Sequence, residues 1–148
     1  MAPLIALCTT FMILRGIGWL GVPMFNHWHP ALQGAVVVMF LLTASAHWGK
    51  RRADLVQMVP RGLVHKEKIV TWTGILEIAG AVGLLIPGVA WIAAAGLLLM
   101  LIVMFPANVH AAREKLTIGG KAVWPVFPRL VLQLLFITAI VLASPWFG

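Results

Sequence analysis

Residues 69–86, IVTWTGILEIAGAVGLLI, decide the fold class of this chain. A helix rises about 1.5 Å per residue, so this apolar run is long enough to cross a hydrocarbon layer of roughly 30 Å with tilt or interfacial ends. One acid, Glu77, lies near its middle, where a charged carboxylate costs at least roughly 2.5 kcal/mol. We therefore expect Glu77 to face protein or water and to have a partner.

The composition extends this conclusion to the whole chain. It has 148 residues, of which 61% are hydrophobic and 10% charged, and its mean hydropathy is +1.00. A water-soluble domain of this size cannot bury so much apolar surface. The sequence predicts an all-α polytopic membrane helix bundle in a single domain, 1–148, with five spans at about 4–22, 31–48, 69–86, 91–112 and 129–146. Pro87 and Gly88 join the third and fourth spans as an antiparallel hairpin.

The basic residues predict the orientation. All but one of the 11 lysine and arginine residues lie between the second and third spans or between the fourth and fifth. Because cytoplasmic loops retain lysine and arginine, we expect a cytoplasmic N-terminus and an outside C-terminus. The net charge of +7 then indicates anionic lipid headgroups rather than nucleic acid, because these loops lack interleaved stacking aromatics. The single cysteine, Cys8, excludes an internal disulfide and dithiol redox chemistry in this chain.

Arg15 is the one basic residue inside a span, and helical rise places it at a depth similar to that of Glu77. The structural interpretation is an Arg15–Glu77 ion pair that fixes the first span on the third. The functional interpretation makes Glu77 a proton-handling or ligand-orienting group with Arg15 as its counter-ion. A third alternative is that the two side chains never meet.

Four more polar residues lie toward the cytoplasmic side of the spans: His47, Thr73, Asn108 and Gln133. With Glu77, they are candidates to line a polar vestibule that binds a ligand or handles protons. The alternative for each is an interfacial position or an interhelical hydrogen bond.

Pro106 predicts a helix kink, because proline removes a backbone donor and leaves the carbonyl of Ile102 without its usual partner. Asn108 lies close enough to contribute to a site formed by such a kink. His27 and His29 flank Trp28 in an outside loop, but this spacing without a carboxylate or thiol does not indicate a metal site, and none is expected.

Two motifs resemble the bacterial DoxX-like membrane proteins. They are TGxxExxGAxGLLxP at 73–87 and FPANVxAA at 105–112, supported by His47-Trp48, by Met58-Val59-Pro60 and by Arg129-Leu130 with Leu132-Gln133. The resemblance covers about 31–146, which would form a four-helix DoxX-like core, and leaves 1–22 as an added N-terminal helix. It implies a bacterial cytoplasmic (inner) membrane protein.

The resemblance also implies an accessory or assembly subunit of a quinone-linked membrane redox complex, without an autonomous catalytic activity. The expected ligands are a quinone or lipid, with no covalent cofactor, and the expected partners are the bilayer and a membrane protein or further copies of the chain. Two alternatives stay open. One is a quinone-coupled redox enzyme subunit with Glu77 exchanging protons, and the other is a small oligomeric proton-coupled transporter.

Overall fold

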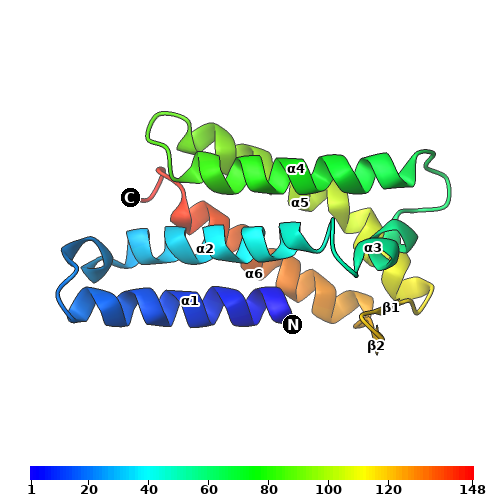
Figure 1. Cartoon of the computed structure of the whole chain (residues 1–148), viewed down its shortest axis with the longest axis horizontal. Coiled ribbons are helices and arrows are strands. Elements are labelled where there is room, and N and C mark those ends of the chain that lie inside the picture. The colour runs from blue at the N-terminus through cyan, green and yellow to red at the C-terminus, as the bar shows by residue number, and fades with distance from the viewer.

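The computed structural model describes residues 1–148 and is almost entirely helical. The long helices are α1 (Ala2–Trp19), α2 (Trp28–Ser45), α4 (Lys66–Leu84), α5 (Ala90–Arg113) and α6 (Val126–Ala143). A short helix, α3 (Arg52–Met58), a 3-10 turn, η1 (Pro23–Asn26), and the hairpin of β1 (Thr117–Ile118) and β2 (Lys121–Ala122) connect them. The long helices lie roughly along the long axis of the molecule, and each runs opposite to the long helix before it (Figure 1).

Four of these helices, α1, α2, α5 and α6, are long and apolar enough to cross a membrane. The third expected span corresponds to α4, which has 19 residues but begins with the charged sequence Lys66-Glu67-Lys68 and contains Glu77. It therefore carries more charge than the other four. In the bundle, α4 runs beside α2 and α5 (Figure 1).

The observed helices begin up to three residues before the expected spans, and local chemistry explains the boundaries. His65, with a left-handed backbone (φ 57°), precedes α4, whose charged first turn belongs to the helix although it is not apolar. Gly21 follows α1 with φ 121°, a conformation that glycine adopts without strain. Pro145 follows Ser144 at the end of α6, and a residue before proline disfavours the helical conformation.

Helix α2 is the centre of the bundle, because it packs against α1, α4 and α6, while α5 packs against α4 and α6. The core residues of α2 include Ala35, Val36, Met39 and Phe40, which belong to the same hydrophobic cluster as the fully buried Leu84 of α4. By contrast, α1 packs mainly on α2 and leaves most of its apolar surface uncovered.

The two connections that hold most of the basic residues, between α2 and α4 and between α5 and α6, lie at the same end of the bundle. The N-terminus lies at this end too (Figure 1). They contact each other directly: the amide of Gly119 donates to Asp54 of α3 at 2.9 Å, and Arg61 pairs with Glu114 at 2.8 Å. The C-terminus and η1 lie at the other end. Positive charge is therefore concentrated at one end of the molecule.

Candidate functional site

Glu77 lies in the middle of α4 and is only 5% exposed. Its helix approaches α2 closely because small residues lie on the same side. A side-chain carbon added at Gly74 would come within 2.8 Å of Cβ and Cγ of His47, which no real contact of this kind tolerates. Gly74 thus lets the end of α2 rest on α4 and brings His47 within reach of Glu77, one turn further along.

The carboxylate of Glu77 has two partners, one from the end of α2 and one from the turn that follows it. Nε2 of His47 lies 3.4 Å from Oε1 of Glu77, and the hydroxyl of Thr43 donates to Oε2 at 2.9 Å. His47 is 4% exposed, so both ionisable groups are buried in the bundle, whereas Thr43 is half-buried. The cost of burying an acid in α4 is offset by a cation-forming ring and a hydroxyl donor from its neighbour.

The backbone fixes which nitrogen of His47 carries a proton. Nδ1 lies 2.6 Å from the carbonyl oxygen of Val70, and a carbonyl only accepts, so Nδ1–H must be the donor. The hydroxyl of Thr73 lies 3.3 Å from the same nitrogen and can share that proton. The lone pair of a neutral His47 would then point from Nε2 to Glu77. One proton between Nε2 and Oε1 satisfies both groups, either as an imidazolium–carboxylate pair or as a neutral pair.

Thr43 allows the group to hold a further proton. Its one hydroxyl hydrogen can go to Oε2 of Glu77 or to the carbonyl of Phe40, each at 2.9 Å. If Oε2 becomes protonated, it can donate to Thr43 while Thr43 turns to Phe40. The arrangement therefore offers hydrogen-bond partners to Glu77 in both of its charge states.

His47 itself lies two residues beyond the end of α2, at the basic end of the bundle. Burial on its own lowers the pKa of His47, but the hydrogen bond and charge of Glu77, with the Val70 carbonyl, outweigh it and raise that pKa above its ordinary value. Arg52 holds the backbone here, because its guanidinium donates to the carbonyl of His47 at 2.7 Å.

The predicted Arg15–Glu77 ion pair is not formed. Arg15 donates to the carbonyl oxygens of Phe25 and Asn26 in η1, at 3.2 Å for Phe25, and lies over the ring of Trp19. A similar depth did not mean contact, because α1 packs on α2 and not on α4. Arg15 also lies in the last turn but one of α1, where the loop carbonyls are closer. Its observed role is to hold the η1 turn against α1.

The expected polar vestibule is divided among separate groups. His47, Thr73 and Glu77 meet as described, whereas Asn108 accepts a hydrogen bond from Arg129 at 2.7 Å, and the amide of Gln133 donates to the carbonyl of Leu101. These last two contacts join α5 to α6 only. Three of the five predicted residues therefore form one site, and two form interhelical hydrogen bonds.

Near Pro106, a side chain of α6 binds a backbone carbonyl of α5. Helix α5 continues through Pro106, and Gln133 binds the carbonyl of Leu101, next to the Ile102 carbonyl that proline deprives of its donor. A kink at Pro106 stays a prediction.

Two hollows of the surface are lined by residues other than His47 and Glu77. One, of about 520 Å³, lies at the basic end and includes Arg52 and Glu67 in its wall. The other, of about 180 Å³, is an apolar groove between α5 and α6 with Gln133 as its polar member. His, Cys, Asp and Glu side chains nowhere gather in a group of three or more that could hold a metal ion.

The sequence analysis missed Thr43 and Arg52. A signal for Thr43 existed, because it precedes His47 by four residues and so falls on the same face of a helix. Arg52 gave no such signal, because its bonds to His47, to the carbonyl of Glu67 and to Thr71 depend on how the loop after α2 turns back.

Comparison with known proteins gives a family without an assigned function. No curated protein matched the chain, and no solved structure matched it. Residues 36–143 match the model of the family described as Domain of unknown function (DUF8561). The match runs from the middle of α2 to the end of α6 and leaves α1 outside. Because the match covers well over half of the chain, the chain belongs to the DUF8561 family.

Proposed function

We propose that this protein is a DoxX-like, multi-pass accessory or assembly subunit of a quinone-linked membrane redox complex, without a catalytic activity of its own. The observation that carries the proposal is that the buried acid is fully partnered inside the bundle. Glu77 accepts from Thr43 and pairs with His47, and neither of these two charged residues is more than 5% exposed. An acid held in this way joins helices, and the outer surface is left for binding.

The outer surface supports a binding role. Large apolar side chains are exposed along α1, α5 and α6, for example Ile13, Leu99, Val103 and Leu134. Such surface is covered by lipid or by another membrane protein. Helix α1 has only one long neighbour in the bundle, so its free face is the natural place for a partner subunit or a second copy of the chain.

The proposed location is the bacterial cytoplasmic membrane, with the N-terminus in the cytoplasm and the C-terminus outside. In this arrangement α4 also crosses the membrane, as the third of five spans. The concentration of basic residues at the end that holds α3 and the hairpin supports this orientation. Pairing of Glu77 with His47 also lowers the cost of carrying an acid across the bilayer.

A second function, proton-coupled transport by an oligomer or proton exchange within a redox enzyme, is favoured by one specific observation. His47 and Glu77 share a single proton position between Nε2 and Oε1. Thr43 can accept a hydrogen bond from a second proton on Oε2 of Glu77. Groups of this kind accept and release protons where access is open. In the present structure His47 and Glu77 are buried, which makes this the second candidate.

Purification from native membranes in a mild detergent tests the first proposal. We expect a membrane redox subunit to copurify at a fixed ratio, with or without bound quinone, and deletion of the gene to lower the activity of that complex. Recovery of the chain without any such subunit, together with unchanged redox activity of the deletion strain, would contradict the accessory role.

Reconstituted vesicles test the second function. A transporter should carry a pH-dependent flux that Glu77→Gln abolishes, while Glu114→Gln, which changes an exposed acid at the basic end, should leave the flux unchanged. Vesicles without flux, or a flux that Glu77→Gln does not alter, would remove Glu77 from transport.

A further inference from the structure

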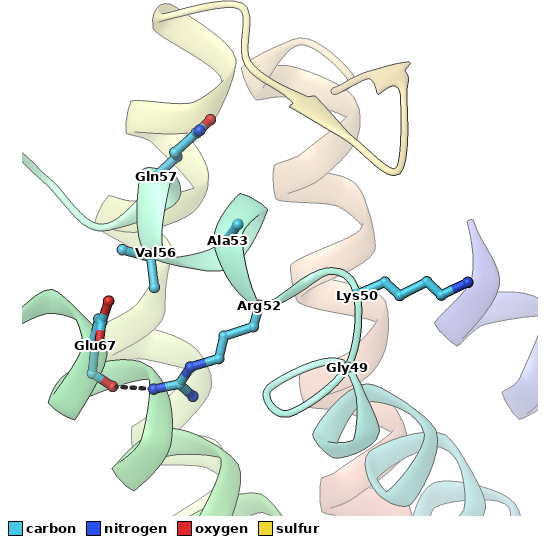
Figure 2. Close-up of a pocket in the computed structure, with 7 residues that line it drawn as sticks. All are labelled: Gly49, Lys50, Arg52, Ala53, Val56, Gln57 and Glu67. Carbon is cyan, nitrogen blue, oxygen red and sulfur yellow. Dashed lines mark hydrogen bonds between the residues drawn. The ribbon is translucent and has the colours of Figure 1, made fainter.

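The hollow of about 520 Å³ at the basic end of the bundle is large enough for a small polar ligand. It lies between the loop that follows α2, the helix α3 and the first turn of α4 (Figure 2). Its charged wall consists of Lys50, Arg52 and Glu67, and its remaining wall includes Val56 and the amide of Gln57. It is separate from the His47–Glu77 site, whose side chains do not line it.

Arg52 gives this hollow a fixed positive charge. Its guanidinium donates to the carbonyl of Glu67 at 3.1 Å and to the hydroxyl of Thr71 at 2.8 Å, in addition to the carbonyl of His47. All three acceptors are neutral, so they hold the group in place without cancelling its charge. A planar guanidinium held in this way suits a phosphate oxygen.

Glu67 gives the same hollow a negative charge without a partner. Its carboxylate takes part in neither of the two salt bridges of the structure and receives no hydrogen bond, although its backbone carbonyl binds Arg52. Figure 2 shows the Glu67 side chain extending from α4 toward Val56, while Lys50 extends away from Arg52 at the far edge of the loop. Lysine has a flexible stem, so its ammonium can move toward a bound anion.

Tryptophans place the hollow at the level of lipid headgroups. Trp48 and Trp72 are exposed near the end of α2 and the beginning of α4, the same two segments that border the hollow. Exposed tryptophans of membrane helices gather at the interface between hydrocarbon and headgroups. At this level the headgroups of membrane lipids are within reach of the hollow.

We propose that this hollow binds a phospholipid whose headgroup carries both a phosphodiester and a terminal primary ammonium. Arg52 and Lys50 would contact the phosphate, and the ammonium would pair with the free carboxylate of Glu67. A headgroup with only negative charge would leave Glu67 unpaired and repelled by the phosphate. The inference rests on the membrane setting of the proposed function, but it does not require the partner subunit.

The experiment measures lipid binding to the purified full-length protein in detergent by native mass spectrometry. Short-chain phosphatidylethanolamine is titrated against short-chain phosphatidylglycerol, which has the phosphate but no ammonium. We expect phosphatidylethanolamine to bind about tenfold more tightly, as one added charged hydrogen bond of about 1.4 kcal/mol would give. Glu67→Gln should remove this preference, and Lys50→Gln should weaken the binding of both lipids.

Matched controls are Glu114→Gln and Arg61→Gln, an acid and a base at the same end of the bundle but outside the hollow. Both should bind like the unchanged protein. Arg52 is not substituted, because it also holds the backbone of His47. Equal or tighter binding of phosphatidylglycerol, or a preference that survives in Glu67→Gln, would overturn the inference. Since no partner is present, such a result would leave the accessory role standing.

Discussion

The contact between His47 and Glu77 should be a major energetic link between α2 and α4, and a double-mutant cycle measures it. Glu77→Leu leaves the buried Nε2 of His47 without its partner and the Thr43 hydroxyl with only the Phe40 carbonyl, and His47→Leu leaves a buried carboxylate with only one donor. Removing one partner of a buried pair typically costs about 3–5 kcal/mol. The double variant replaces both groups by apolar ones, and its loss should be smaller than the sum of the two single losses by the coupling energy of the pair.

The size of the coupling follows from the geometry. Two unit charges at the observed 3.4 Å attract by about 5 kcal/mol at an effective dielectric constant of about 20. Desolvation of both groups offsets part of this attraction, so we expect a coupling energy of about 1–3 kcal/mol. The measurement is the free energy of unfolding by SDS titration in mixed micelles, followed by circular dichroism.

The exposed pair Arg61–Glu114 is the matched control, because its side chains are 79% and 40% exposed. The same cycle at that pair should give a coupling of about 0–1 kcal/mol. If the losses of His47→Leu and Glu77→Leu are simply additive, within about 0.5 kcal/mol, the pair does not join the two helices and the reasoning is refuted.

Three further predictions concern packing, hydrogen bonding and pH. Gly74→Ala should cost about 1–3 kcal/mol of unfolding free energy, because the new methyl group displaces His47; a neutral result would show that α2 can move away freely. Gln133→Leu should cost about 0.6 kcal/mol, and at most about 1.7, because it removes one interhelical bond to the Leu101 carbonyl; a loss above 3 kcal/mol in the same SDS titration would contradict this. Because the pKa of His47 is raised by folding, the stabilisation it brings is fully present below about pH 6.5 and is lost as the pH rises through the folded-state value. The loss caused by Glu77→Leu should therefore be larger at about pH 6 than at about pH 9, and equal losses at both would contradict the ion pair.

The helices were largely predictable from the sequence, because long apolar runs and turn residues such as Pro87-Gly88 act locally. Boundaries moved by a few residues where a charged first turn, as in α4, is helical without being apolar. The charge of that turn also explains why four helices, and not five, are apolar enough by composition alone.

The partners of Glu77 were predictable only in part. The sequence placed His47, Thr73 and Glu77 on the same side of the bundle, and the structure brings them together. It could not identify the true partner, because contact depends on which helices are neighbours. That choice places α2 beside α4, whereas Arg15 lies on α1 and finds carbonyl groups of the η1 turn.

The central claim is that Glu77 joins helices and does no chemistry, and the double variant His47→Leu with Glu77→Leu tests it most directly. Its function is measured in native membranes, as copurification of the proposed partner subunit and activity of the proposed redox complex, after the protein has been shown to be folded and present at normal levels. The account predicts that both readouts match those of the unchanged protein. A folded double variant that binds its partner but no longer supports activity would contradict the account and make Glu77 a proton-handling residue.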